Sequence, residues 1–367
     1  MRIAVDAHIL GKGKGGVERY VAELCARLPA LAPEDSFLFF INSTYVPAKR
    51  DPNVRWIRLP GSEPMLQRSL FLPWMIARFR PDVIHTQRIA PLWSNCPVIV
   101  SMHDILPLTV PDDYPGMRHA MVRALTGWSA RRAHTILTVS RTVQEEIEGA
   151  LPGAKGKVEV IYNGVNREMF SWVDKKIPAG TNQEYLLYAG AIEPRKNLVL
   201  VLQAFSEVCA GMGDDLKLIL AGMDRDVQYA AGLRRTCRTM FSDGQVIFTG
   251  FLQDNEYLEY LARASIFLAP SRGEGFDLPP LEAMACGIPV ICSDIAVHQE
   301  IFGKAALFFQ VDSPNALAKA IMTLYNDSQL KKKLRLRGMA CCRRFDWEAT
   351  VWQTLKIYRE AGRKKSV

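Results

Sequence analysis

Two glutamates, Glu274 and Glu282, are separated by seven intervening residues within the stretch 271–293. An apolar run, ASIFLAP, precedes this stretch and predicts a buried strand. A polar loop with two glycines follows, and then Pro279 and Pro280 suit a first helical turn, where a backbone N–H has no partner to lose. The pattern therefore predicts strand, glycine-rich loop, helix and strand, with both carboxylates able to face one ligand.

This arrangement favours a particular chemistry. Open α/β sheets bind ligands at the carboxyl ends of their strands, where the predicted loop lies. The start of a helix offers backbone N–H groups and the positive end of a dipole, which suits a phosphate. A carboxylate accepts hydrogen bonds well, for example from sugar hydroxyls. A ligand that carries both phosphate and hydroxyl groups fits both features.

The motif EPRKN supplies two adjacent cations, Arg195 and Lys196, beside the predicted start of a helix at Leu198. Such a pair can bind a diphosphate, with arginine acting as a planar fork and lysine as a point charge. The alternative interpretation is a basic surface turn with no ligand.

A third candidate is His103, which with Asp104 ends the predicted strand 97–104. A single histidine is more often structural than functional. The carboxyl tip of a strand is nevertheless the ligand-facing edge of such a sheet. Both interpretations stay open from the residues alone.

The loop GKGKGG, residues 11–16, contains four glycines between a predicted strand and a helix whose Val17 and Val21 begin an apolar face. Glycine allows the backbone to approach a ligand closely. A flexible surface loop is the alternative.

Strands alternate with helical stretches along most of the chain, which predicts α/β architecture with parallel sheets covered on both faces. A polar, irregular segment at 166–183 predicts a linker between two halves. The predicted strands are 2–10, 37–43, 54–60, 82–87, 97–104, 133–140 and 158–165, then 185–190, 216–222, 246–252, 265–270, 288–293 and 306–310.

The composition limits the class of protein. A chain of 367 residues is too long for one ordinary core, so two domains are expected. Hydrophobic content of 49% with 23% charged residues is typical of a soluble globular protein, and no apolar run reaches membrane-spanning length. The N-terminus is expected to enter a strand and not to be a signal peptide. Eight scattered cysteines without a CxxC motif favour reduced thiols in the cytoplasm, without a zinc site.

The net charge of +8 is concentrated in residues 1–180, which hold 23 Lys and Arg against 17 Asp and Glu. A basic surface can meet nucleic acid, an anionic membrane or a diphosphate; no nucleic-acid motif is present, so that partner is not expected. Segments 64–80 and 118–132 carry arginines beside Trp74 and Trp128, and could lie on an anionic membrane surface. Pro73 is expected to kink or break the first segment. Ordinary helices packed on the sheet are the equal alternative.

The pattern GEGFxLPxLEAMAxGxPV around the two glutamates resembles the donor-site signature of retaining glycosyltransferases of family four, which have the GT-B fold. The EPRKN motif is similar to that of a subset associated with mannosyl transfer. Two positions depart from the family pattern. Asp277 stands where the family usually has glycine, and Ala191 stands where an arginine usually follows the glycine.

The resemblance implies two Rossmann-like domains that face each other across a cleft. The expected divisions are an acceptor-side domain at 1–165, the linker at 166–183, a donor-binding domain at 184–345 and a helix at 346–367 that returns to the first domain. A helical stripe of apolar residues fits that last helix: Trp347, Val351, Leu355 and Tyr358.

The implied reaction is the retaining transfer of a sugar to a glycan or lipid-linked acceptor in lipopolysaccharide O-antigen or exopolysaccharide synthesis. Mannose from GDP-mannose is the expected sugar. The nucleoside-diphosphate sugar would be a substrate, so no cofactor and no metal are expected. The enzyme would be cytoplasmic, or peripheral at the inner face of the membrane. The alternatives are a GT-B relative that transfers no sugar to an acceptor, such as a sugar-nucleotide epimerase or a phosphorylase, or an inactive sugar-nucleotide-binding partner.

The resemblance also assigns residues. The expected catalytic residues are His103, Glu274, Arg195 and Lys196. Within the donor site, Glu282 would hold the ribose, and Glu274 with the Gly275 and Phe276 backbone would hold the sugar hydroxyls. The full set expected to bind the donor is Gly15, Gly16, Gly190, Arg195, Lys196, Gly273, Glu274, Gly275, Phe276, Asp277, Leu278 and Glu282.

Overall fold

The computed structural model describes residues 1–13, 15–48, 51–60, 71–109, 117–172, 185–212 and 216–363. The chain forms two compact units. The first unit comprises Met1–Gly164 together with Trp347–Val367, and the second unit comprises Val165–Asp346. The predicted linker at 166–183 begins with a 3-10 helix, η4 (Arg167–Trp172), in the second unit, and its later part lies outside the described residues.

The first unit is built on a seven-stranded parallel sheet in the order β3-β2-β1-β4-β5-β6-β7. Its central strands are buried on both faces because helices cover both, as parallel sheets require. Ala4 of β1, for example, pairs with Leu38 of β2 and Ile84 of β4, and all three are buried. The strands are β1 (Arg2–Asp6), β2 (Ser36–Ile41), β3 (Val54–Arg58), β4 (Val83–Gln87), β5 (Val98–Ser101), β6 (Thr135–Thr138) and β7 (Val158–Val160).

The helices of the first unit follow from local signals in the sequence. The Ser140 side chain accepts a hydrogen bond from the Val143 N–H and caps its helix, as a serine at this position should. Pro73 lies in the first turn of α3, where proline is favoured because no N–H is needed. The first part of the segment 64–80, before Phe71, lies outside the described residues, so the expected kink or break stays a prediction. The helices are α1 (Gly16–Leu31), α3 (Leu72–Phe79), α4 (Leu106–Thr109), α5 (Met117–Arg132), α6 (Arg141–Ala150), the 3-10 helix η3 (Pro152–Ala154) and α14 (Trp347–Arg363).

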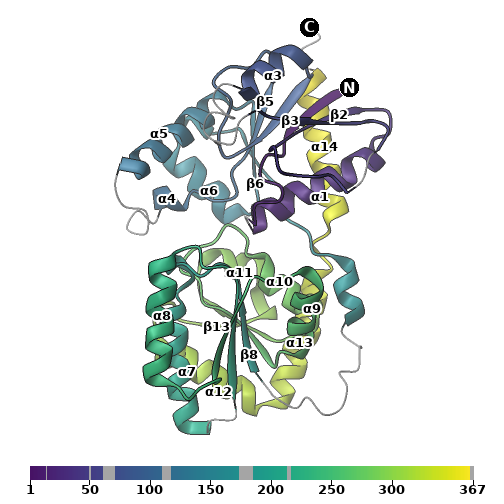
Figure 1. Ribbon diagram of the computed structural model, residues 1–367. Helices are drawn as coiled ribbons and strands as arrows, with labels where there is room; N and C mark the ends of the chain where they lie inside the picture. The colour runs from purple at the N-terminus through teal and green to yellow at the C-terminus, as the bar shows by residue number, and fades with distance from the viewer. Residues whose placement is uncertain are drawn as a thin grey trace. The chain divides into compact units, whose positions relative to one another are not determined.

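Helix α14 returns from the far end of the sequence and lies beside α1 within the first unit (Figure 1). Its apolar stripe, Trp347, Val351, Leu355 and Tyr358, is fully buried. The Tyr358 hydroxyl lies 2.5 Å from Nδ1 of His85 on β4, so the contact ties the helix to the centre of the sheet.

The second unit repeats the plan with a six-stranded parallel sheet in the order β10-β9-β8-β11-β12-β13. Its strands are β8 (Tyr185–Ala189), β9 (Lys217–Ala221), β10 (Val246–Gly250), β11 (Ile266–Ala269), β12 (Val290–Ser293) and β13 (Leu307–Phe309). Its remaining helices are η5 (Pro194–Lys196), α7 (Leu198–Met212), α8 (Val227–Met240), α9 (Asp254–Arg263), α10 (Leu278–Ala285), α11 (Ala296–Phe302), η6 (Gly303–Ala305), α12 (Pro314–Asn326) and α13 (Ser328–Cys342).

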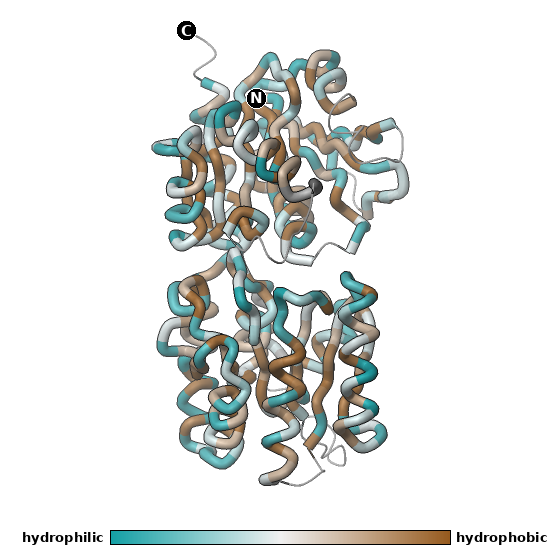
Figure 2. The backbone as a smooth tube through the Cα atoms, turned by 90° about the vertical axis from the view of Figure 1, so that its left-hand side faces the viewer, coloured by the Kyte–Doolittle hydropathy of each residue, from teal (hydrophilic) through white to brown (hydrophobic). Residues whose placement is uncertain are grey.

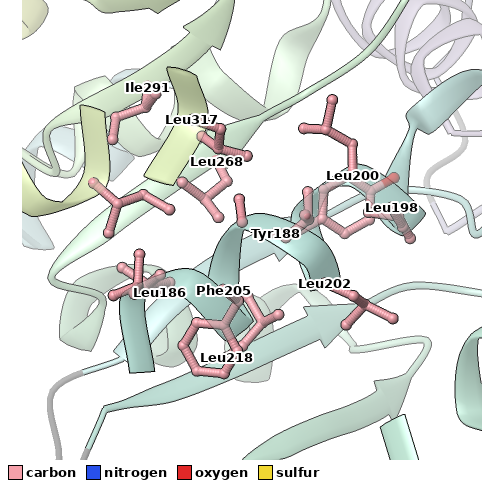
Figure 3. Close-up of a cluster of buried hydrophobic side chains, with 14 of the residues drawn as sticks. Leu186, Tyr188, Leu198, Leu200, Leu202, Phe205, Leu218, Leu268, Ile291 and Leu317 are labelled. Carbon is pink, nitrogen blue, oxygen red and sulfur yellow. The ribbon is translucent and has the colours of Figure 1, made fainter. Parts of the chain in front are cut away.

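Helix α7 is packed into the core of the second unit. Its Leu202 and Phe205 lie against strand residues such as Leu218 and Leu186, as Figure 3 shows. The tube in Figure 2 is hydrophobic along the strands and alternates along the outer helices, which is the pattern that a covered sheet imposes.

Every strand predicted from the sequence is present, and the expected fold class of two Rossmann-like α/β units is confirmed. The first strand is shorter than predicted, however, because a turn with the Leu10 N–H donating to the Ala7 carbonyl follows Asp6. All eight cysteines are free thiols, and most are buried. No helix in the described ranges has the length and hydrophobicity needed to cross a bilayer.

Candidate active site

The loop after β8 carries Arg195 and Lys196 on the short 3-10 helix η5. The first guanidinium nitrogen of Arg195 (Nη1) donates to the Gly273 carbonyl at 2.7 Å and lies 2.7 Å from Oε1 of Glu274. The second nitrogen (Nη2) donates to Glu193 at 2.7 Å. Arg195 therefore joins its own loop to the loop after β11.

Lys196 lies deeper, with its side chain 9% exposed. Its Nζ atom is 2.5 Å from Oε1 of Glu274 and 3.5 Å from Oδ1 of Asp277. Burial alone would raise the pKa of Glu274, but the charges of Arg195 and Lys196 outweigh this effect and hold the pKa well below its usual range. Glu274 is therefore a carboxylate at neutral pH.

One backbone hydrogen bond joins the two loops, and a side-chain hydroxyl of β12 holds the loop after β11. The Arg272 N–H donates to the Arg195 carbonyl at 3.0 Å, and the Ser293 hydroxyl donates to the Ser271 carbonyl at 2.5 Å. Phe276 is buried and meets the ring of Phe345 edge-on, with ring centroids 5.5 Å apart. The Gly273–Gly275 segment is thus fixed on both sides.

Asp277 has a left-handed backbone conformation, with φ at 68°. Glycine adopts this region easily and aspartate is one of the few other residues that tolerate it, which explains how Asp277 can stand at a position where the family usually has glycine. Its carboxylate points inward: Oδ1 faces Lys196 and Oδ2 lies 3.1 Å from Nε2 of His298. Leu278 then begins α10, with the two prolines in its first turn as expected.

Glu282 lies on α10 and is mostly buried. The Tyr257 hydroxyl, on α9, donates to its Oε2 atom at 2.9 Å. This contact fixes the orientation of the carboxylate that the resemblance assigns to ribose binding.

Gly190 lies at the end of β8, where a Cβ atom would be 2.8 Å from the Tyr188 hydroxyl and 3.8 Å from Cε of Lys196. The Tyr188 hydroxyl donates to the Ala191 carbonyl at 2.7 Å. On the neighbouring strand, a Cβ atom at Gly222 would be 1.7 Å from the Gly190 carbonyl, so glycine is required there for the loop to fold over the strand ends.

In the first unit, His103 follows β5 at the carboxyl edge of the sheet. Its Nε2 atom is 3.1 Å from Oε1 of Gln87, and its ring meets Tyr20 edge-on at 4.8 Å between centroids. Burial lowers the pKa of His103 to about 4, although Asp104 opposes the change. His103 is therefore neutral at pH 7 and, because Gln87 offers an oxygen, carries its hydrogen on Nε2.

Gly15 and Gly16 stand at the start of α1, where Gly15 occupies the N-cap position with φ at 64°. The preceding loop is held by the Gly11 N–H, which donates to Glu18 at 2.6 Å.

The structure thus joins five of the second-unit candidates through hydrogen bonds and ion pairs at one strand edge: Arg195, Lys196, Gly273, Glu274 and Asp277. Glu282 contacts Tyr257 on α9. His103, Gly15 and Gly16 belong to the first unit. Sequence reasoning missed Glu193, Tyr257, His298 and Gln87. Gln87 is the last residue of β4, at the carboxyl edge of the sheet, a signal that could have found it. His298 lies inside α11, and no spacing relates Tyr257 to Glu282.

Comparison with known proteins concerns the family of the chain. A model described as Glycosyltransferase Family 4 matches residues 14–169, and one described as Glycosyl transferases group 1 matches residues 172–339. The chain is 25% identical to O-antigen chain mannosyltransferase B of Escherichia coli, over 94% of this chain and 96% of that protein. It is 32% identical to O-antigen chain mannosyltransferase RfbU of Salmonella typhimurium, over 66% and 64% of the two chains.

Among solved structures, HepE of Anabaena in complex with UDP-glucose superimposes with a TM-score of 0.75 and 18% identity, over 97% of this chain and 99% of that chain. At this identity the likeness concerns the fold alone. The two family models together span nearly the whole chain, and each matches one of the two α/β halves. The chain therefore belongs to the group 1 glycosyl transferases with the GT-B fold, in a subset that resembles mannosyltransferases.

Proposed function

We propose that this protein is a retaining hexosyltransferase that moves mannose from GDP-mannose to a glycan or lipid-linked acceptor in the synthesis of a cell-surface polysaccharide. The mannosyltransferase names of the relatives support the choice of sugar, and their O-antigen names support the pathway class. The complex of the Anabaena protein with UDP-glucose supports a nucleotide sugar as the donor class.

The observation that carries the proposal is the cluster of Arg195, Lys196 and Glu274. Two cations at the end of a parallel sheet can neutralise the leaving diphosphate electrostatically, which is how such a transfer is accelerated. Glu274, held as a carboxylate by the same cations, can accept hydrogen bonds from hydroxyls of the sugar. The same cluster can thus contact both the sugar and the diphosphate, the two groups joined by the bond that breaks.

The remaining roles follow the family pattern. Glu282 would bind the ribose hydroxyls, and the backbone of Gly275 and Phe276 would bind the sugar. The acceptor hydroxyl would attack from the face that the diphosphate leaves, and the leaving phosphate would help to take its proton. This scheme needs no protein nucleophile, metal or cofactor. His103 would accept a hydrogen bond from the sugar at Nδ1.

A lipid-linked acceptor would bring the protein to the inner face of the membrane. Trp74 on α3 and Trp128 on α5 support this part of the proposal, because their side chains are 52% and 37% exposed and lie among arginines. Arg132 also lies over the Trp128 ring, 5.8 Å from its centroid. Exposed tryptophan beside arginine suits an anionic membrane surface.

Two measurements test the proposed function. A thermal-shift screen over GDP, UDP and ADP sugars identifies the donor, because a ligand that binds only the folded state raises the melting temperature. An assay of nucleotide release and of the product's anomeric configuration, with and without acceptor glycan, then separates transfer from the alternatives. An epimerase would convert the nucleotide sugar without releasing GDP, and an inactive partner would bind it unchanged.

A further inference from the structure

His298 is fully buried beneath the cluster, on α11, and both of its ring nitrogens face acceptors. Nε2 lies 3.1 Å from the Asp277 carboxylate. Nδ1 lies 3.0 Å from the Ser293 carbonyl, which can only accept a hydrogen bond.

The hydroxyl of Ser293 is also 3.2 Å from Nδ1, but it donates its hydrogen to the Ser271 carbonyl at the shorter distance of 2.5 Å. It is therefore a third acceptor for the ring. A neutral imidazole would leave one nitrogen lone pair against an acceptor, whereas an imidazolium donates from both nitrogens. The contacts therefore assign a positive charge to His298.

A buried charge must be paired, and Asp277 is the carboxylate that pairs with it. The other oxygen of Asp277 is 3.5 Å from Nζ of Lys196. Lys196 consequently pairs with two carboxylates, those of Glu274 and Asp277, and Asp277 pairs with two cations. Its left-handed backbone shows why the side chain can turn inward at this point.

We propose that Asp277 and His298 form a buried ion pair that positions Lys196 for the donor diphosphate. This inference rests on the proposed function, because Lys196 is taken as a phosphate-binding cation. Asp277 then acts on the donor through Lys196 and not by direct contact. Asp277 and His298 are positioning residues for the transfer reaction.

A double-mutant cycle tests this relay. Calorimetry would measure GDP binding, with UDP as a second probe, to the wild type, Asp277→Asn, Lys196→Met and the combined variant. We expect Asp277→Asn to weaken binding roughly tenfold, a size typical of coupling between residues in contact, and to have no further effect once Lys196 is replaced. Wild-type affinity in Asp277→Asn, or an equal loss in both backgrounds, would overturn the proposal.

A double variant distinguishes a role of the ion pair in positioning Lys196 from a role in folding. Asp277→Asn with His298→Gln replaces the ion pair by two neutral amides, so no buried charge is left unpaired, and asparagine tolerates the left-handed backbone. We expect the melting temperature to recover toward the wild type while GDP binding stays weak. Recovery of both would make the pair structural only. Asp327→Asn, at the N-cap of α13, is the matched control for the loss of one aspartate charge.

Nuclear magnetic resonance of protein labelled with ¹⁵N-histidine gives a readout that does not need a nucleotide. The two ring signals that disappear in His298→Gln should both carry hydrogen in the wild type at pH 7, and one should lose it in Asp277→Asn. A bare ring nitrogen in the wild type would refute the ion pair. If instead the pair is charged but neither GDP nor UDP binds to the wild type, the proposed function fails, and with it the positioning role.

Discussion

Nζ of Lys196 and Oε1 of Glu274 lie 2.5 Å apart, although the two residues are 78 positions apart in the sequence. The contact joins the loop after β8 to the loop after β11, which are neighbouring strands in the sheet. Glu274 holds the Lys196 ammonium in place for a phosphate, and the charge of Lys196 in turn keeps Glu274 ionised. Two charged side chains of the proposed donor site are therefore fixed by contacts within the protein.

The stability of this cluster should depend on pH. Because the folded pKa of Glu274 is lowered, its contribution to the free energy of unfolding is present in full above the ordinary value of 4.5 and is lost as pH falls toward the folded pKa. We expect Glu274→Gln to destabilise the protein by roughly 1–3 kcal/mol at pH 6 and by less at pH 3. Urea unfolding at the two pH values measures this, and an equal difference at both would contradict it.

Tyr257→Phe should affect the nucleoside part of the donor and spare the diphosphate. Removing the hydroxyl leaves Glu282 without one of its hydrogen bonds, which costs about 1 kcal/mol or roughly fivefold in affinity. Calorimetry should show weaker binding of GDP and unchanged binding of inorganic pyrophosphate. Equal losses for both ligands would show that Glu282 does not face the ribose.

His103 should act as a neutral group. With a folded pKa of about 4, it stays uncharged from pH 6 to pH 8, so kcat should show no titration of His103 in that range. His103→Ala should lower kcat strongly with a smaller change in nucleotide affinity, and His103→Gln should recover part of the rate. If His103→Ala lowers the melting temperature by many degrees while the folded fraction keeps its activity, the residue is structural.

The burial of His85 predicts a second effect of pH on stability, in the first unit. Burial lowers the pKa of His85 to about 3, from an ordinary 6.5. As pH falls below 6.5 the unfolded chain takes up a proton that the folded chain does not, so stability should decrease by up to about 1.4 kcal/mol per pH unit for this group.

Denaturant unfolding at pH 7, 6 and 5 checks this effect. His85→Gln should reduce the slope, while Tyr358→Phe should lower stability by about 1–2 kcal/mol at pH 7 because it leaves a buried ring nitrogen without its partner. An unchanged slope in His85→Gln would contradict the assignment.

Membrane association should depend on Trp128 and on salt. Sedimentation with vesicles that contain anionic lipid should exceed that with neutral vesicles, and should fall as salt screens the arginines. Trp128→Ser should weaken it, whereas Trp352→Ser removes an equally large exposed side chain from α14 and should not. Equal binding to both kinds of vesicle would exclude an electrostatic membrane surface.

The sequence was sufficient to predict the fold class. A parallel sheet covered on both faces needs short apolar strands, and these are visible in the sequence, as at 265–270. It also indicated the loops that carry Arg195 and Glu274. It could not show that Asp277 turns inward, because that depends on one backbone angle and on a histidine 21 positions away. Partners such as Tyr257 arise from packing between helices, which leaves no spacing to detect.

The most direct test of the account is a calorimetric titration of GDP-mannose into the wild type and Arg195→Gln. Glutamine keeps much of the length of the arginine side chain but removes its charge. The matched control is Arg234→Gln, which breaks an ion pair with Asp224 in the same unit. The account predicts binding to the wild type and the control, and about tenfold to hundredfold weaker binding to Arg195→Gln, the loss expected for a charge-assisted contact. Equal affinity for all three proteins would contradict it.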